Sequence, residues 1–232
     1  MLTDITNQFN HMIHRVEQCE LLTEPWPHMF VPEIIKTEDY RKFTEFDTAE
    51  GLVTDPVEFE VSNRHEYAFD MDNESEADIR YFNKMANKFF HVVAGKFGLS
   101  FEGQEVLPTT RFWKDTSDLL IDDIHRDEFF DTTFTLSCLI YLPKDTSQVA
   151  YGSKLYEYTG NNMEEHTIQD EGTSGPHMVK KDCEEHFKCV RTVPFLPNCM
   201  FIAPNFDNTW HQAPTNIAEG DFRNSLMMRW KV

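Results

Sequence analysis

The chain has 232 residues, of which 40% are hydrophobic and 13% aromatic, and its formal net charge is −19 at pH 7. A chain of this length can bury one sizeable core, so we expect a single folded domain and exclude disorder as its main state. The negative charge repels phosphate backbones and anionic lipid headgroups, so neither free nucleic acid nor a membrane is an expected partner. The same charge is compatible with a soluble acidic surface or with a basic substrate.

Helical patterns occupy the first half of the chain. Apolar residues recur at helical spacing over residues 3–22 and more strongly over residues 75–97, where Ser75 is a candidate N-cap and Gly98 lies near the expected end. A proline-containing stretch follows the first helix, and a short helix is expected over residues 38–46. The apolar stripes of these helices are expected to pack on a sheet.

From about residue 106 onward, short β-type stretches alternate with turn residues. A run of strands after a run of helices predicts an α+β protein with a mainly β core. A double-stranded β-helix, or jelly roll, backed by N-terminal helices satisfies this order. Residues 1–105 then form the helical support region and first strands, and residues 106–232 form the jelly-roll core. Residues 159–186, rich in glycine and asparagine, are the expected mobile loop, which either covers substrate or joins strands.

No apolar stretch approaches the length of a membrane span, and the N-terminus lacks the basic and apolar regions of a signal peptide. We therefore expect a cytoplasmic location. The five cysteines form no even set, so no disulfide framework is expected. His177, Cys183, His186 and Cys189 are zinc-type ligands, but their spacing matches no common zinc module, so a second metal site is not expected.

The tripeptide His125-Arg126-Asp127 lies on an expected strand, where residues i and i+2 point to the same face. His125 is the only histidine followed two positions later by an acidic residue. His211 lies in a segment that ends in Gln212-Ala213-Pro214, which indicates a strand end beside a turn. Two imidazoles and one carboxylate form a facial triad, which holds Fe(II) and leaves positions open for reactants. The alternative is a partly buried His211 satisfied by backbone, with Asp127 as a surface acid.

Strand alternation after His211 directs Arg223 and Ser225 to one side. A planar guanidinium can hold a carboxylate through two parallel hydrogen bonds and stays charged at any working pH. Arg223 is therefore a candidate clamp for the far end of a dicarboxylate. The alternative is a surface arginine in an acidic protein.

In their order and spacing these motifs resemble the Fe(II)/2-oxoglutarate-dependent oxygenases, and within them the prolyl-4-hydroxylase-like branch. The resemblance runs from about residue 106 to residue 230. It also rests on the hydrophobic stretch 134–143, on the stretch 151–156 and on the stretch 194–198. This chain differs from the family at Tyr151-Gly152, where two glycines are common. It also has Arg111-Phe112-Trp113 on the strand that often carries a tyrosine.

The resemblance implies roles for six residues. His125, Asp127 and His211 match the catalytic iron ligands of that family. Arg223 matches the basic residue that binds the distal carboxylate of 2-oxoglutarate, and Ser225 is expected to assist it. Tyr141 falls where a tyrosine often supports the same carboxylate. The alternative for Tyr141 is a core-edge tyrosine with its hydroxyl at the surface.

The resemblance also implies the reaction. Fe(II), the co-substrate 2-oxoglutarate and O2 would hydroxylate a substrate with release of succinate and CO2, and ascorbate would stimulate turnover. A prolyl residue in a peptide or protein is the first substrate expected, while a free amino acid, a small metabolite and a cell-surface sugar remain open. Nucleobase demethylation would need a basic groove, against which the charge argues.

Two functions from other classes stay open because a fold alone does not determine function. One is a non-catalytic jelly-roll binding module whose metal is lost or structural. The other is a cupin-type metal enzyme that does not use 2-oxoglutarate and has no need for a dicarboxylate clamp such as Arg223 with Ser225.

Overall fold

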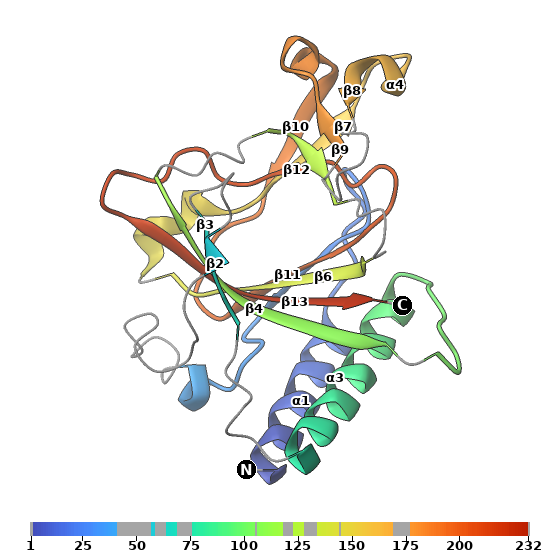
Figure 1. The fold of residues 1–232 in the computed structure, drawn as a ribbon, viewed down its shortest axis with the longest axis vertical. Helices are drawn as coiled ribbons and strands as arrows, with labels where there is room; N and C mark the ends of the chain where they lie inside the picture. Colours follow the sequence, from blue (N-terminus) through green and yellow to red (C-terminus); the bar gives the residue numbers. More distant parts are fainter. Residues whose placement is uncertain are drawn as a thin grey trace.

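The computed structural model describes residues 2–40, 57–58, 64–68, 76–104, 106–117, 123–127, 134–143, 145–168 and 177–231. Two β-sheets face each other, and two long helices lie against the outer face of the larger sheet (Figure 1). All strand pairings within both sheets are antiparallel among the residues described. The predicted α+β class with a mainly β core and N-terminal helices is confirmed.

The larger sheet has seven described strands in the order β1-β11-β6-β13-β4-β3-β2. Its long central strands pair over most of their length, so this sheet is continuous where it faces the smaller sheet. The bounds in chain order are β1 Met29–Pro32, β2 Val57–Glu58, β3 Arg64–Ala68, β4 Leu107–Thr116, β6 Phe134–Tyr141, β11 Cys199–Pro204 and β13 Phe222–Lys231.

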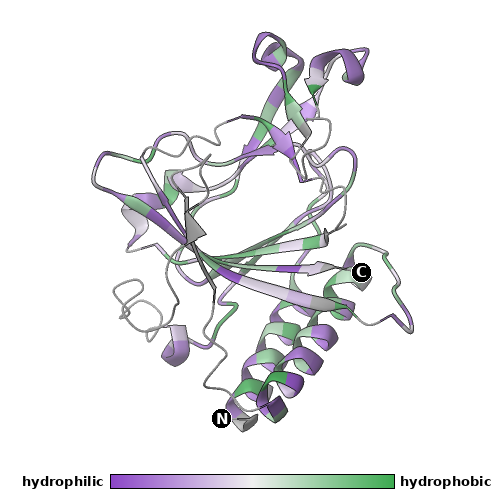
Figure 2. Cartoon of the chain, in the orientation of Figure 1, coloured by the Kyte–Doolittle hydropathy of each residue, from purple (hydrophilic) through white to green (hydrophobic). Residues whose placement is uncertain are grey.

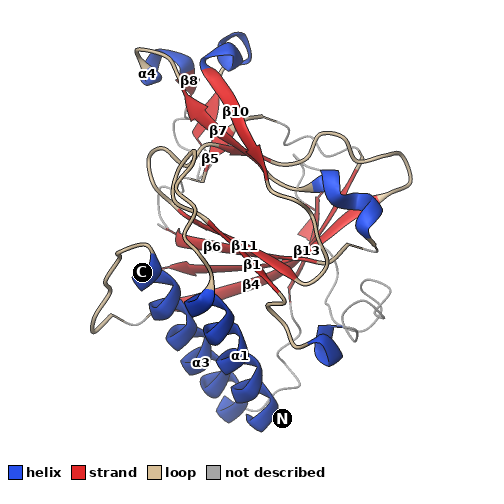
Figure 3. Ribbon diagram, turned by 180° about the vertical axis from the view of Figure 1, so that it is seen from behind, coloured by secondary structure: helices blue, strands red, loops and turns tan. Residues whose placement is uncertain are grey.

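The smaller sheet has six described strands in the order β10-β7-β12-β5-β9-β8. Its two central strands, β12 and β5, are each two residues long. The bounds in chain order are β5 His125–Arg126, β7 Lys154–Tyr158, β8 Thr167–Ile168, β9 His177–Val179, β10 Phe187–Thr192 and β12 His211–Gln212. The ends of β7 and β10 extend away from the larger sheet, as the view from behind shows (Figure 3).

The helices α1 (Leu2–Gln18) and α3 (Glu76–Lys96) lie side by side beneath the larger sheet. Each carries hydrophobic residues on one side and hydrophilic residues on the other (Figure 2). Phe89 and Phe90 of α3 are fully buried, and their rings lie 5.9 and 5.8 Å from the ring of Trp230 on β13. Burying side chains of this size typically stabilises a fold by about 1.5–3 kcal/mol each. The helices therefore hold β13 from its outer face.

The first helix ends four residues earlier than the predicted range of 3–22. Leu22 and His28 form an isolated bridge with backbone hydrogen bonds of 2.9 Å in both directions. This bridge requires an extended backbone at Leu22, so the helix stops before it.

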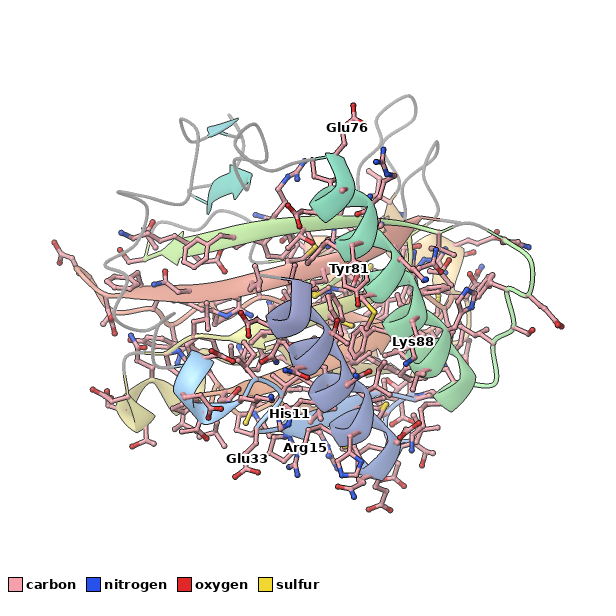
Figure 4. All side chains as sticks on the ribbon, turned by 90° about the horizontal axis from the view of Figure 1, so that it is seen from below. His11, Arg15, Glu33, Glu76, Tyr81 and Lys88 are labelled. Atoms are coloured by element: carbon pink, nitrogen blue, oxygen red, sulfur yellow. The ribbon has the colours of Figure 1, made fainter. Side chains whose placement is uncertain are left out.

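Figure 4 shows α1 from below, where His11 donates to the Glu33 carbonyl at 2.8 Å and Arg15 lies 3.4 Å from the Glu33 carboxylate.

The end of α3 agrees with the predicted stop at Gly98. The Leu99 N–H donates to the Ala94 carbonyl at 3.0 Å while Gly98 takes a φ of 72°, which is the usual closure of a helix by a left-handed residue. The expected N-cap Ser75 lies outside the described residues. Residues 37–40 are helical, and the rest of the short helix predicted over residues 38–46 also lies outside them.

The predicted loop over residues 159–186 contains ordered elements. Helix α4 (Met163–His166), strands β8 and β9, and the 3₁₀-helix η2 (Lys181–His186) all fall within it, with residues 169–176 outside the described part. Strand β9 pairs with β5, so that Met178 lies opposite His125. This segment therefore joins and extends the smaller sheet beside the first histidine of the His-x-Asp motif.

Three buried clusters fill the layers. One lies between the larger sheet and the helices, a second lies between the two sheets around Tyr141, Leu155 and Phe195, and a third around Trp210 lies on the opposite side of the smaller sheet. The 3₁₀-helix η1 (Thr146–Tyr151) leads from β6 to β7. Among the described helices, none is long and apolar enough to cross a membrane.

Gly152 is required by a close approach of two backbone segments. A Cβ at this position would lie 1.5 Å from the Val193 carbonyl oxygen, and Val193 itself donates to the Ser153 carbonyl at 2.8 Å. We expect Gly152→Ala to lower the free energy of unfolding by about 1–3 kcal/mol or more, because backbone atoms must move apart. Urea denaturation measures this.

The matched control is Gly95→Ala on α3, where an added Cβ meets nothing within 4 Å. Alanine favours a helix over glycine by roughly 0.5–1 kcal/mol, so this variant is expected to be slightly more stable than the parent. Equal effects of the two substitutions would contradict the backbone contact at Gly152.

Candidate metal centre and neighbouring ion pairs

The two strands at the centre of the smaller sheet bring two histidines together. β12 pairs with β5 in a register that sets His211 opposite His125, and the two ring centroids lie 4.5 Å apart. Asp127 comes directly after β5, so its side chain points to the same side as His125. The three predicted ligands are therefore neighbours. The strand predicted to include Asp127 ends one residue earlier, at Arg126.

Both imidazoles are held in the same tautomer. His125 Nδ1 lies 2.9 Å from the Asp123 carbonyl, and His211 Nδ1 lies 2.9 Å from the Thr209 carbonyl. A carbonyl oxygen only accepts, so Nδ1 must donate in each case, and in the neutral ring Nε2 carries the lone pair. The backbone bond expected of a structural His211 is thus present, but it uses one nitrogen and directs the other toward Asp127.

The Asp127 carboxylate completes the group. Its Oδ1 lies 4.0 Å from Nε2 of His125 and 4.0 Å from Nε2 of His211, which is too long for hydrogen bonds. One ligand atom from each residue lies within 4.8 Å of the other two, and this is the one such group of three in the described parts of the chain. Two imidazole lone pairs and a carboxylate are a donor set suited to Fe(II), so the residues present fit that metal.

Arg229 on β13 holds the other oxygen of the same carboxylate. Its Nη2 donates to Asp127 Oδ2 at 3.1 Å, and its Cζ lies 5.2 Å from the ring centre of Trp113. The side chain of Asp127 is only 14% exposed, so its interpretation as a surface acid is wrong. Partners of this kind orient a metal ligand and adjust its affinity. Arg229 was not among the predicted site residues, although it lies at an even spacing from Arg223 on β13 and therefore on the same face.

Arg223 is buried, and its partner, Asp115, was not among the predicted site residues. The side chain is 2% exposed, and Nη1 donates to Asp115 Oδ2 at 2.6 Å. Asp115 lies opposite Arg223 in the pairing of β13 with β4 and is fully buried. The guanidinium carbon lies 5.5 Å from the ring centres of both Tyr141 and Phe195. The interpretation of Arg223 as a surface arginine is therefore wrong.

Ser225 and Tyr141 lie opposite each other on neighbouring strands, and both are fully buried. Tyr141 has its hydroxyl 3.4 Å from Ser153 Oγ, so the alternative with a hydroxyl at the surface is wrong. Burial raises the pKa of the Tyr141 hydroxyl above its ordinary value, and the nearby charge of Arg223 offsets only part of that rise. Ser225 Oγ and Arg223 Nε are buried and have no hydrogen-bond partner within the described structure. These atoms can still bind an incoming anion.

The predicted site residues thus form two groups. His125, Asp127 and His211 lie on the smaller sheet, and Arg223, Ser225 and Tyr141 lie on the larger sheet. The contact between Arg229 and Asp127 links the two sheets at the first group, and the buried cluster that contains both Tyr141 and Leu155 fills the space between the sheets. The first group can hold a divalent metal, and the second can bind a carboxylate.

No protein-family model and no curated protein sequence matches this chain. Solved structures do match it. A prolyl-4-hydroxylase from Pseudomonas putida is 13% identical, with a TM-score of 0.51 over 95% of this chain and 98% of that chain. A prolyl hydroxylase from Trichoplax adhaerens, in complex with a hypoxia inducible factor peptide fragment, is 11% identical, with a TM-score of 0.51 over 99% and 91%.

A third similar structure is HygX from Streptomyces hygroscopicus, which was solved with nickel and 2-oxoglutarate bound. It is 14% identical, with a TM-score of 0.53 over 88% of this chain and 82% of that chain. At such identities the similarity concerns the fold. The chain has the jelly-roll fold of the Fe(II)/2-oxoglutarate oxygenases, a group that includes prolyl-4-hydroxylases.

Proposed function

We propose that this protein is a dioxygenase that uses Fe(II), 2-oxoglutarate and O2 to hydroxylate a substrate, with release of succinate and CO2. The observation that carries this proposal is the group of His125, Asp127 and His211, in which both Nε2 lone pairs and one carboxylate oxygen lie together. The fold of the Fe(II)/2-oxoglutarate oxygenases supports it.

In this proposal each group of residues has a separate task. His125, Asp127 and His211 would hold the iron, which with 2-oxoglutarate supplies the oxygen-activating chemistry. Arg223 and Ser225 would bind the distal carboxylate through the donors that are unpartnered in the described structure, with Tyr141 beside them. The apolar cluster around Leu155 and Phe195 would keep water away from that carboxylate. Ascorbate would stimulate turnover.

A prolyl residue in a peptide or protein is the substrate class that we propose to test first. Two of the similar folds belong to prolyl hydroxylases, one of them solved with a peptide. A net charge of −19 favours a neutral or basic peptide over an acidic one and disfavours nucleic acid. Incubation of a peptide library with the iron-loaded protein, followed by mass spectrometry for a gain of one oxygen, tests this class.

A metal enzyme that does not use 2-oxoglutarate is the second candidate. The observation in its favour is that Asp115 already takes one donor of Arg223 in a buried contact of 2.6 Å. Because Asp115 already satisfies the charge of Arg223, Arg223 can have a purely structural role in which no external dicarboxylate takes part. Such an enzyme would bind Fe(II) at the same three residues but would produce no succinate.

Removal of one candidate metal ligand tests the proposal directly. Anaerobic addition of Fe(II) and 2-oxoglutarate is expected to produce a metal-to-ligand charge-transfer band in the parent protein. In His211→Ala the band and 2-oxoglutarate-dependent succinate formation are expected to be lost, because one of the two imidazole ligands is gone. The fold is expected to persist, since His211 is partly exposed.

The matched control is His166→Ala, which removes a partly buried histidine that stacks on His186 at 3.9 Å, outside the candidate metal centre. It is expected to keep the band and the activity. Retained turnover in a folded His211→Ala protein would contradict the assignment of the ligands.

Arg229 is proposed to position Asp127 for metal binding. Arg229→Met is expected to weaken Fe(II) binding by about 10–100-fold, because Asp127 loses the donor that orients its carboxylate. Competition with a chromogenic chelator measures the affinity without any need for turnover. Arg80→Met, which removes an exposed arginine paired with Glu76 on α3, loses the same charge and is expected to leave the affinity unchanged. Equal affinities in the Arg229 and Arg80 variants would rule out this role for Arg229.

A further inference from the structure

Arg223 is proposed to bind an external carboxylate, yet its guanidinium already contacts an internal one, that of Asp115. Asp115 is fully buried, Arg223 is 2% exposed, and the two side chains meet at 2.6 Å. The contact comes from paired positions on β13 and β4, so the fold itself brings the carboxylate to the guanidinium. A buried guanidinium without a counter-charge is strongly unfavourable, and Asp115 therefore stabilises Arg223 before any ligand arrives.

The guanidinium still has donors for a second anion. An arginine side chain carries five N–H donors in a planar fork, and the contact with Asp115 involves Nη1. Arg223 Nε is buried and has no partner in the described structure, and the same holds for Ser225 Oγ two positions along the strand. A carboxylate that reached these two groups would share the guanidinium with Asp115.

We propose that Asp115 is an internal counter-ion that competes with the distal carboxylate of the co-substrate for Arg223, and thereby sets both the affinity for 2-oxoglutarate and the selectivity among 2-oxo acids. This inference rests on the proposed function. Two carboxylates on one guanidinium repel each other, and burial leaves that repulsion poorly screened. The protein therefore binds a dicarboxylate less tightly, and selects it over a 2-oxo acid with an uncharged tail less strongly, than an unopposed arginine would.

The experiment compares 2-oxoglutarate with 2-oxohexanoate, which has an uncharged tail. Both are titrated anaerobically into the Fe(II)-loaded protein, and the charge-transfer band reports each Kd. In Asp115→Asn, which keeps the shape of the side chain and removes its charge, the Kd for 2-oxoglutarate is expected to fall by about tenfold or more. The Kd for 2-oxohexanoate is expected to stay within about twofold of the parent value.

The direction of the change separates this role from a structural one. If Asp115 only held Arg223 in position, Asp115→Asn would bind 2-oxoglutarate more weakly, and that result or an unchanged Kd would overturn the proposal. The matched control is Asp221→Asn, which removes a carboxylate held by Tyr151 and Gln148 instead of by Arg223. Its Kd for 2-oxoglutarate is expected to stay within about twofold of the parent value.

The selectivity of the parent protein and its thermal stability with glutarate give two further tests. If Asp115→Asn does not fold, the parent protein decides: it is expected to prefer 2-oxoglutarate over 2-oxohexanoate by less than about tenfold, and any larger preference contradicts the proposal. If the parent gives no band with any 2-oxo acid, the proposed function fails. Glutarate then tests Asp115 without metal, because it is expected to raise the Tm of Asp115→Asn more than that of the parent. An equal rise would overturn the inference.

Discussion

The pairing of β12 with β5 is the contact on which the candidate site depends. It sets His211 opposite His125, and directly opposed residues of an antiparallel pair share one face of the sheet. Asp127 then reaches the same point because it follows β5 at once. A shift of one residue in this register would turn His211 to the opposite face of the sheet. The register of the two-residue strands β5 and β12 must therefore be exact for the three ligands to meet. Pairing of β12 with β7 and of β5 with β9 holds the two strands in place.

One face of strand β13 packs on apolar side chains, and its other face carries charged ones. Leu226, Met228 and Trp230 belong to the cluster shared with the helices, whereas Arg223 and Arg229 contact carboxylates on the other face. The alternation of side chains along a strand makes this division possible. Because α1 and α3 supply an apolar layer on the outer face, the inner face can hold charged groups without loss of the hydrophobic support. The helices are therefore part of what positions the site.

The parts of the site that could be predicted are those that local alternation encodes, namely His125 with Asp127 and Arg223 with Ser225. The ion pairs of Arg223 with Asp115 and of Arg229 with Asp127 could not, since they join residues 108 and 102 positions apart. The first pair depends on the register of β13 against β4, and the second depends on how the two sheets face each other; a pattern of period two specifies neither. Similarly, β9 was expected in a loop because its short segment has no pattern of its own, and its backbone partners come from β5. The two long helices could be predicted because each carries its own apolar stripe, although α1 ends four residues before its predicted end.

Charge determines how these parts would work together. The whole protein is strongly acidic, so an anionic co-substrate is repelled unless the site supplies local positive charge. Arg223 and Arg229 lie on the same face of β13, but Asp115 and Asp127 already offset part of their charge. Both histidines donate from Nδ1 to carbonyls and are neutral when they bind a metal through Nε2. A divalent ion would then be the largest local cation. In the proposed function, a bound metal would therefore add to the local positive charge that attracts a dicarboxylate, so that metal binding would favour co-substrate binding.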